Sequence, residues 1–364
     1  MILKDLVNII NEEFPFALQE GYDNSGLLLG DPHKKITKGL ICFDLTENVL
    51  NEAVESKCDI IISHHPLIFD AIKSLTGKNF NERILIKAVK NDIAIIAVHT
   101  NIDNSFIGVN KVFAEKLGLD NLNILAPKQN MLKKLVVFCP LAHAEKVRKA
   151  MFDAGAGKIG DYDSCSYNLN GEGSFRASDA ANPFVGEVDK LHFEPEVRIE
   201  TIFPEYLQNV ILNEMIKAHP YEEVAYDIYS LDNKFYRAGA GMIGDLKDPL
   251  KEEEFLKLVK NSLNATVLKH SELIGKEISR VAVCGGSGGF LLENAIRMGA
   301  DAFISGDIKY HQFLDSQNNI LLVDAGHFET EHFTSNIIYE IVSKKITNFA
   351  LQISQRQKNA VNYF

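Results

Sequence analysis

Histidines and carboxylates occur directly after apolar segments at three places in the sequence. The first is the tetrapeptide SHHP, in which His64 and His65 follow the apolar residues 60–62. An uninterrupted apolar run is typical of a parallel strand buried on both faces, and ligands of open α/β sheets bind beyond the carboxyl ends of such strands. Because neighbouring side chains of a strand point apart, the two histidines could serve two different metal ions. The alternative is an exposed polar pair in a loop fixed by Pro66.

The second place follows the apolar residues 93–98, where the sequence continues HTNIDN. Asp103 could ligate a metal directly, whereas His99 could ligate it or orient another ligand through a hydrogen bond. An Asx turn formed by Asp103 and Asn104 explains the same residues without a metal.

The third place is the segment DAGHFETE, after the apolar residues 320–323. His327 and Glu331 are four residues apart and therefore share one face if a helix begins there. A histidine and a glutamate one turn apart match divalent-metal ligation. The alternative is an acidic first turn that the helix dipole favours.

Together these places supply His64, His65, Asp103, His327 and Glu331 as candidate metal ligands. Five ligands are too many for one catalytic zinc ion, which keeps three protein ligands. They fit two divalent ions with a carboxylate, here Glu331, able to bridge them. Mixed nitrogen and oxygen ligands accept zinc, iron or manganese, so the metal stays open.

Several motifs resemble one family over residues 21–331. They are GYDNSGLLLGD, DLT, DIIISHHPLIF, HTNIDN, CGGSGG, SGDIKYH and DAGHFETE. In this order they resemble the NGG-interacting-factor-like dinuclear metal family, which is labelled GTP cyclohydrolase type 2 homologue. The segments GAGKIGDYDSCSY, ANPFVGE and HPYEEVAYDIY resemble the insert of its longer bacterial members. The resemblance implies a two-metal centre at the five residues above and a homohexamer with the metals facing an internal cavity.

Further polar residues are candidates for supporting ligands or contacting a substrate. A structural role is an equal alternative for each of them. Asn24 and Ser25 belong to this group, whereas we expect His219 of the insert to cap the preceding helix rather than bind metal. The remaining members are Asp44, His99, Asp307, His311 and Glu329.

The order of expected elements predicts an α/β protein with an inserted domain. Apolar strands alternate with amphipathic helices in residues 1–128 and again in residues 237–364, which favours a mostly parallel sheet covered on both faces. Residues 129–236 show the order strand, helix, strand twice, which is the α+β ferredoxin-like pattern. We expect this domain to interrupt an outer metal-binding domain of two similar halves.

An internal repeat supports the similarity of the halves. A shift of 242 positions places NEAVESKCDIIIS on ENAIRMGADAFIS without a gap, with Asp59 on Asp301 and Ser63 on Ser305. An internal duplication explains this match, and chance similarity of two strand–helix units is the alternative.

Composition and missing motifs exclude several classes of protein. The net charge of −11 disfavours nucleic-acid binding. No apolar stretch approaches the length of a membrane span, and no secretory signal is visible. The five cysteines are scattered and form no CxxC pair. We therefore expect a cytoplasmic protein. The glycine-rich residues 285–289 lack the GxGxxG spacing and the ending of a P-loop, so a tight turn is favoured over a phosphate-binding loop. No GxSxG elbow is present, which disfavours a serine nucleophile.

Two functions remain open from the sequence. The first is a metal-dependent hydrolase acting on a nucleotide-like substrate, in which Glu329 or His99 shuttles protons. The second is a non-enzymatic metal-handling or regulatory oligomer. Because clustered carboxylates repel one another, we also expect that Glu331→Gln slightly raises the melting temperature of the metal-free protein.

Overall fold

The expected apolar strands are present in the computed structural model, which describes residues 1–364. They belong to two compact units. The outer unit comprises residues 1–127 and 237–364, and the inserted unit comprises residues 128–236. The mixed α/β architecture with parallel and antiparallel sheets confirms the predicted fold class. None of the helices combines the length and apolar character that a membrane crossing requires.

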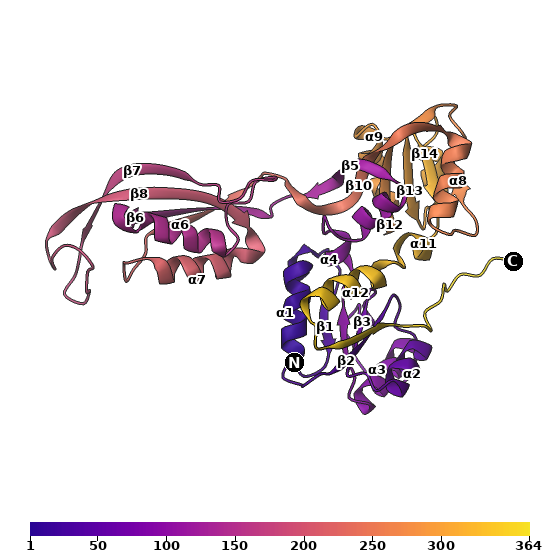
Figure 1. Cartoon of the computed structure of the whole chain (residues 1–364), viewed down its shortest axis with the longest axis horizontal. Helices are drawn as coiled ribbons and strands as arrows, with labels where there is room; N and C mark the ends of the chain where they lie inside the picture. The colour runs from indigo at the N-terminus through magenta and orange to yellow at the C-terminus, as the bar shows by residue number, and fades with distance from the viewer. The chain divides into compact units, whose positions relative to one another are not determined.

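The first sheet of the outer unit has the strand order β1-β4-β3-β2-β15 (Figure 1). Strands β15, β2, β3 and β4 are parallel, and β1 pairs with β4 antiparallel. The bounds are β1 Gly26–Leu29, β2 Lys38–Cys42, β3 Ile60–Ser63, β4 Ala94–Ala97 and β15 Ala350–Ile353.

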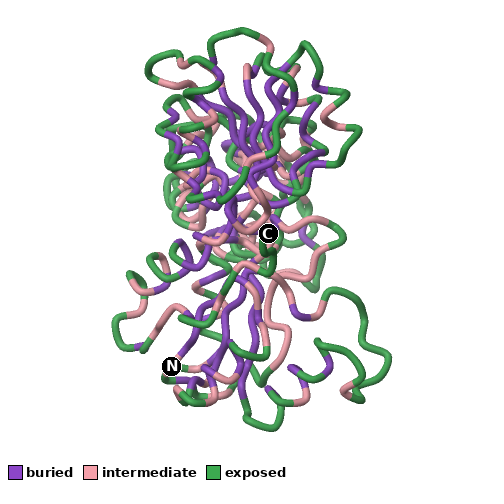
Figure 2. The backbone as a smooth tube through the Cα atoms, turned by 90° about the vertical axis from the view of Figure 1, so that its right-hand side faces the viewer, coloured by how far each residue is buried: buried purple, intermediate pink, exposed green.

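Burial on both faces explains why these strands are apolar without alternation. Ile60 and Ile62 of β3 join one core cluster, whereas Ile61 between them joins another. Figure 2 shows the strands as the buried interior of the outer unit, with exposed loops around them. The helices before and between these strands are α1 Leu3–Glu13, α2 Glu47–Glu55, α3 Phe80–Lys90, α4 Thr100–Asp103 and α5 Val109–Lys116.

The second sheet of the outer unit has the order β11-β14-β13-β12-β10-β5. Its central strands β12, β13 and β14 are parallel, and β10 and β11 pair with them antiparallel. The strand bounds are β5 Leu119–Lys128, β10 Phe235–Lys251, β11 Lys269–His270, β12 Glu277–Ser287, β13 Ala302–Gly306 and β14 Leu321–Asp324. The helices of this part are α8 Glu252–Ser262, α9 Leu292–Arg297, α10 Tyr310–Asp315, α11 His327–Glu331 and α12 Thr334–Lys345.

The internal repeat corresponds to an aspartate that makes the same kind of backbone hydrogen bonds in each half. Asp59 accepts hydrogen bonds from the backbone amides of Thr37 and Lys38, at the start of β2. Asp301, its partner in the repeat, accepts them from the amides of Ser279 and Arg280, near the start of β12. In each half one carboxylate ties the beginning of the first parallel strand to the beginning of the second.

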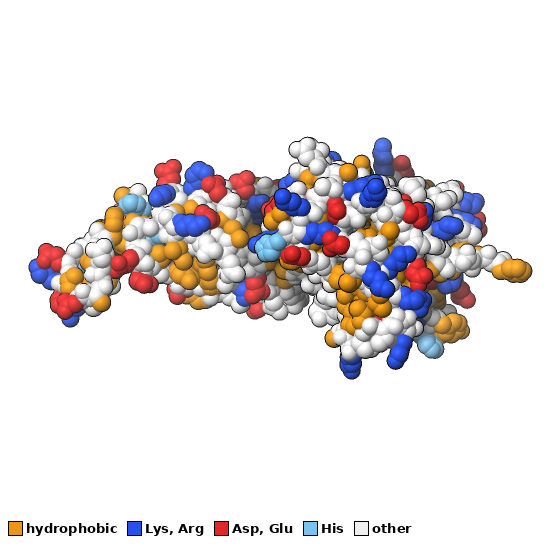
Figure 3. Space-filling view, turned by 90° about the horizontal axis from the view of Figure 1, so that it is seen from below, with side chains coloured by type: hydrophobic (Ala, Val, Ile, Leu, Met, Phe, Trp, Pro, Cys, Tyr) orange, Lys and Arg blue, Asp and Glu red, His pale blue; other side chains and the backbone are white.

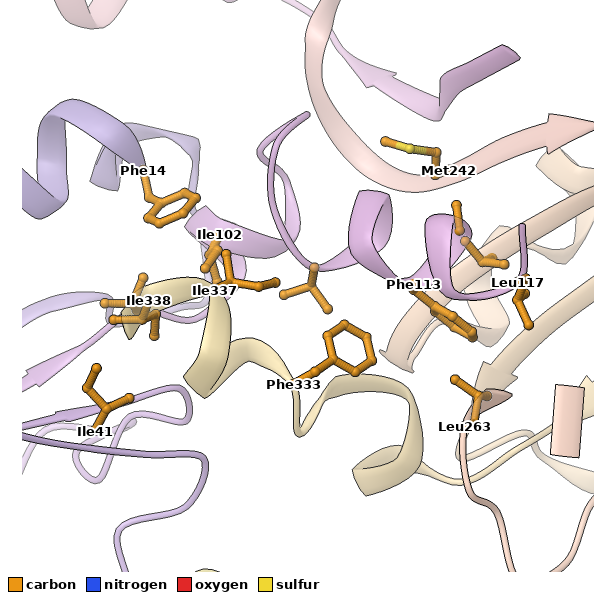
Figure 4. Packing of buried hydrophobic residues seen from close by; sticks show 14 of the residues in the cluster. Phe14, Ile41, Ile102, Phe113, Leu117, Met242, Leu263, Phe333, Ile337 and Ile338 are labelled. Carbon is orange, nitrogen blue, oxygen red and sulfur yellow. The ribbon is translucent and has the colours of Figure 1, made fainter. Parts of the chain in front are cut away.

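The two sheets do not coincide with the two halves of the sequence. Strand β5 follows the first half but pairs with β10 in the second sheet, and the C-terminal β15 pairs with β2 in the first. The largest core cluster therefore contains residues of both halves, including Phe14, Ile41, Met242 and Phe333 (Figure 4). This exchange makes the outer unit one packed body.

The inserted unit is a four-stranded antiparallel sheet with the order β7-β8-β6-β9. This order, with a helix after β6 and another after β8, is ferredoxin-like, as the sequence predicts. Both helices cover the same face of the sheet (Figure 1). Pro204 ends strand β8, and the second helix starts at Gln208. The bounds are β6 Leu132–Pro140, α6 Ala144–Asp153, β7 Tyr167–Arg176, β8 Leu191–Pro204, α7 Gln208–Ala218 and β9 Tyr226–Leu231.

The points where the inserted unit leaves and re-enters the outer unit are close together. Strands β5 and β10 are neighbours in the second sheet, and the backbone of Gly239 packs directly against Ala126 and Pro127. A short link could therefore join residue 127 to residue 237, which removes only Lys128 from β5 and Phe235 and Tyr236 from β10.

We predict that replacing residues 128–236 by a short Gly-Ser link leaves the outer unit folded. Its core clusters contain no residue of the inserted unit, so the melting temperature should change by no more than about 5 °C. Circular dichroism and calorimetry measure the effect. Loss of a cooperative thermal transition would contradict the prediction.

Candidate metal centre

The five candidate ligands converge at one point of the outer unit. Oε2 of Glu331 lies 3.6 Å from Nε2 of His64, 3.6 Å from Nε2 of His65 and 3.0 Å from Nε2 of His327. Oδ1 of Asp103 lies 3.8 Å from Nε2 of His64. Residues up to 267 positions apart in sequence therefore place their donor atoms around a common centre.

Strand ends position these side chains. His64 and His65 follow β3, and Asp103 is the last residue of α4, shortly after the neighbouring β4. His327 and Glu331 are the first and last residues of α11, which follows β14. Each ligand therefore stands just beyond the carboxyl end of a buried parallel strand, where open α/β sheets bind ligands.

Hydrogen bonds to Nδ1 fix the orientation of all three imidazoles. Nδ1 of His64 donates to the carbonyl oxygen of Val98 at 2.8 Å. Nδ1 of His65 donates to Asp44 and Nδ1 of His327 donates to Asp307, both at 2.7 Å. This arrangement leaves each Nε2 facing the centre and is the usual support of metal-ligating histidines. Asp44 and Asp307 are thus placed beside the candidate ligands.

Three of the donor atoms at the centre have no hydrogen-bond partner. Nε2 of His64, Oδ1 of Asp103 and Oε2 of Glu331 are buried without a hydrogen bond. Buried polar atoms are normally satisfied, because an unsatisfied one costs about 1–3 kcal/mol. Two donors of one tetrahedral zinc ion stand about 3.3 Å apart, since each bond is about 2.0 Å. The separations of 3.0–3.8 Å fit a bound cation.

Charges at the centre divide the histidines into two kinds. Burial lowers the pKa of His64 to about 4, so this imidazole is neutral at pH 7. Burial acts in the same direction on His65 and His327. There it is outweighed by hydrogen bonds to carboxylates, which raise the pKa of His65 to about 10 and that of His327 to about 9.

The two carboxyl groups shift in opposite directions. Burial and the negative charge of Glu331 raise the pKa of Asp103. Burial also acts to raise the pKa of Glu331, but its contacts with His327, His64 and His65 lower it overall. The metal-free centre therefore holds an ionised Glu331 among imidazoles. The direction of this shift favours a lower melting temperature for metal-free Glu331→Gln, in place of the higher one expected from the sequence, because the charge of Glu331 is attracted to the neighbouring imidazoles.

The glycine-rich turn after β12 contacts the centre. Gly286 has a φ of 58°, and a Cβ there would lie 2.2 Å from Oε1 of Glu331. Its amide donates to Oγ1 of Thr330 at 3.0 Å. The absence of a side chain lets the backbone approach α11, so the turn has a packing role beside Glu331.

His99 stands at the edge of the centre and is held there by Asp23, a residue that the sequence analysis did not identify. A ring nitrogen of His99 lies within 4.8 Å of ring nitrogens of His64 and His65. Its Nδ1 donates to Oδ1 of Asp23 at 2.7 Å. The pKa of Asp23 is lowered overall, since hydrogen bonds from His99 and Thr100 outweigh its burial. Asp23 directly precedes Asn24 and Ser25, and that adjacency was the available signal.

A cavity of about 250 Å³ adjoins the candidate ligands. Its lining includes His65, His327, Glu329 and residues of the C-terminal segment. Asn359 of this segment donates through Nδ2 to Oε1 of Glu329 at 2.9 Å. Glu329 thus lines the cavity, whereas His311 is exposed on α10, contacts the ring of Tyr310 and lines no part of the cavity.

A family model matches almost the entire chain. The model of Duf34/NIF3 (NGG1p interacting factor 3) covers residues 1–360. The chain belongs to the Duf34/NIF3 family. Relatives named "GTP cyclohydrolase 1 type 2 homolog" include a Bacillus subtilis protein that is 37% identical over 99% of this chain and 95% of its own length. Another, from Listeria monocytogenes, is 36% identical over 88% and 86% of the two chains.

Solved structures of NIF3-related proteins share the fold. A Bacillus cereus protein related to NIF3 superposes with a TM-score of 0.87 and 37% identity, covering 100% of this chain and 99% of its own. A Staphylococcus aureus protein superposes with a TM-score of 0.77 and 27% identity over the same shares. These matches confirm the family that the motifs indicate.

We predict that metal binding at pH 7 releases protons from His65 and His327, whose pKa values lie above 7 in the metal-free protein. Affinity should rise about tenfold per pH unit for each proton released. Protonation of His65 stabilises the metal-free fold. This stabilisation is complete at pH values below 6.5, the ordinary pKa of histidine, and is lost as the pH rises through about 10, the pKa of His65 in the fold.

Calorimetric titration with Zn²⁺ in two buffers of different ionisation enthalpy measures the released protons. His192→Gln is the matched control, because His192 also pairs with a carboxylate, at 2.9 Å from Glu194, but lies in the inserted unit. A binding enthalpy that is the same in both buffers would contradict the prediction.

Proposed function

We propose that the protein binds two divalent ions and acts as a hydrolase on a nucleotide-like substrate. In this proposal His64 and Asp103 hold one ion, His65 and His327 hold the other, and Glu331 serves both. The observation that carries it is the position of the Glu331 carboxylate between the two groups. The groups His64, Asp103, Glu331 and His65, His327, Glu331 each bring their donor atoms within 4.8 Å of one another.

When bound, such ions polarise a carbonyl or phosphoryl oxygen and lower the pKa of water. The chain supplies proton transfer beside them. His99, held through Nδ1 by Asp23, can accept a proton at its other ring nitrogen and pass it to solvent, because its side chain is partly exposed. Glu329 of α11 lines the same cavity as His327 and offers a carboxylate there.

The size and lining of the cavity support a substrate with a flat ring. Phe43, Phe328 and Tyr363 supply aromatic faces, and Asp307 and Lys269 supply polar contacts. A volume of about 250 Å³ is smaller than a pocket for a complete ligand, which is typically about 300–1,000 Å³. It suits a heterocyclic base while the rest of a nucleotide remains outside. The names of the relatives also point to a nucleotide.

The proposal includes a cytoplasmic homohexamer, as the family resemblance implies. All five cysteines are free, which suits a reducing compartment. Acidic and basic side chains are interspersed on the face shown in Figure 3, without a large basic patch for nucleic acid. A non-enzymatic metal-handling assembly is the competing function, and it predicts metal binding without turnover.

We predict that Glu331→Gln lowers the affinity for at least one of the two ions by about 100-fold or more, because a neutral amide replaces the shared anionic ligand. Both the metal-free and the metal-loaded variant should melt below the wild-type protein, since the charge pairs with imidazoles in one form and with cations in the other. Elemental analysis and calorimetric titration measure occupancy and affinity.

Glu340→Gln is the matched control, because Glu340 is an exposed glutamate of the following helix α12. It should keep wild-type occupancy. Retention of both ions at wild-type affinity by Glu331→Gln would show that Glu331 is no ligand, and the shared carboxylate would then have to be Asp103.

The catalytic part of the proposal is tested by turnover. Protein loaded with Zn²⁺, Mn²⁺ or Fe²⁺ is incubated with GTP, ATP and their nucleosides, and release of phosphate, formate or ammonia is followed. We expect turnover of at least one nucleotide that falls about 100-fold or more in His64→Ala, with Glu340→Gln unchanged. Metal-loaded protein that turns over none of these compounds would favour the non-enzymatic function.

A further inference from the structure

The inserted unit contains a cavity that is larger than the one beside the metal centre. It measures about 680 Å³, within the range of about 300–1,000 Å³ that is usual for small-molecule sites. It opens on the face of the four-stranded sheet that the helices leave uncovered. Val197 and Ile199 of β8 pack toward α6 and α7, whereas Glu196 and Arg198 of the same strand line the cavity.

Aromatic rings form an angled wall of this cavity. The ring centroid of Tyr221 lies 6.4 Å from that of Phe175 and 6.3 Å from that of Phe184, with interplanar angles of 58° and 51°. The rings therefore enclose a corner rather than stack. His219 holds this wall in place, because its Nδ1 accepts a hydrogen bond from the amide of Tyr221 and its Nε2 donates to the carbonyl of Phe138.

The charged side chains of the lining are predominantly acidic. Its carboxylates are Glu172, Glu196, Glu222 and Glu223. Arg198 is the single cation, and it already has partners. One guanidinium nitrogen lies 2.9 Å from Glu200, and the guanidinium carbon lies 6.0 Å from the centre of the Phe138 ring.

The carboxylate of Glu196 is held against the aromatic wall. It accepts a hydrogen bond from the hydroxyl of Tyr221 at 3.0 Å. On the neighbouring strand β7, a Cβ at position 173 would lie 2.3 Å from Oε2 of Glu196. Gly173 therefore provides the space in which this carboxylate lies across the sheet.

We propose that this cavity binds a small organic cation with an apolar body, such as an amine or a quaternary ammonium compound. Aromatic faces attract cations through the ring quadrupole, and a nearby carboxylate adds a charge-assisted hydrogen bond to an ammonium group. The volume accommodates a metabolite rather than a bare ion. This site is independent of the proposed hydrolase function, because every lining residue belongs to the inserted unit.

Three probes with one apolar body test the charge preference on the full-length protein. They are phenylbutylamine, phenylbutanol and phenylbutyrate, each titrated calorimetrically. We expect one amine bound per chain, with the alcohol at least about tenfold weaker and the carboxylate weaker still, because only the amine gains the ionic contact. Amine binding should persist after EDTA treatment.

Two variants locate the site. Glu196→Gln keeps an acceptor for Tyr221 but removes the charge, so amine affinity should fall about tenfold while alcohol affinity stays within about twofold. Phe184→Ala removes a wall and should weaken both probes. The matched control is Glu214→Gln, because Glu214 of α7 pairs with Lys217 and does not line the cavity.

Several results would overturn the proposal. Tighter binding of phenylbutyrate than of the amine would show an anion site, served by Nε of Arg198, which is buried without a partner. Amine binding that disappears with EDTA would place the amine at the metal centre. Equal amine affinity in Glu196→Gln and wild type, or no binding of any probe, would also reject an organic-cation site here.

Discussion

The architecture of the outer unit depends on placing one ionised carboxylate, that of Glu331, among three imidazoles in a buried position. Removing such groups from water costs several kcal/mol per charge unless the surroundings compensate. Protonated His65 and His327 compensate in the metal-free protein, and bound cations would do so more completely. Protonated histidines and bound cations both stabilise the carboxylate only at short distances from it. The donor atoms must therefore be held in place before any ion binds.

Rigid anchoring meets this demand. Each imidazole is fixed by a hydrogen bond from Nδ1, to a backbone carbonyl for His64 and to Asp44 or Asp307 for the other two. The anchors sit at the ends of buried parallel strands, where the backbone has little freedom. The exchange of β5 and β15 between the sheets adds to this rigidity, since it joins the strands that carry the ligands into one packed core.

The inserted unit has its polar groups arranged differently from those of the metal centre. Its sheet buries one face under two helices and leaves a charged face with an aromatic corner. Its carboxylates are spread over a large cavity instead of converging on a point, so they favour an extended organic ligand over a metal ion. In these two proposals one polypeptide carries two binding sites, one that coordinates metal ions and one that uses aromatic rings and dispersed carboxylates.

The sequence by itself determined the parallel strands, the ferredoxin-like order of the insert and the five residues proposed as ligands, because local periodicity and residue type at strand ends express them directly. Tertiary structure decided which strands share a sheet: nothing local in residues 119–128 or 350–353 indicates that they cross to the opposite sheet. It also decided that Asp23 supports His99 and that His311 points to solvent. Such contacts join residues far apart in sequence. Their free energies depend on burial and distance, which only the folded chain defines.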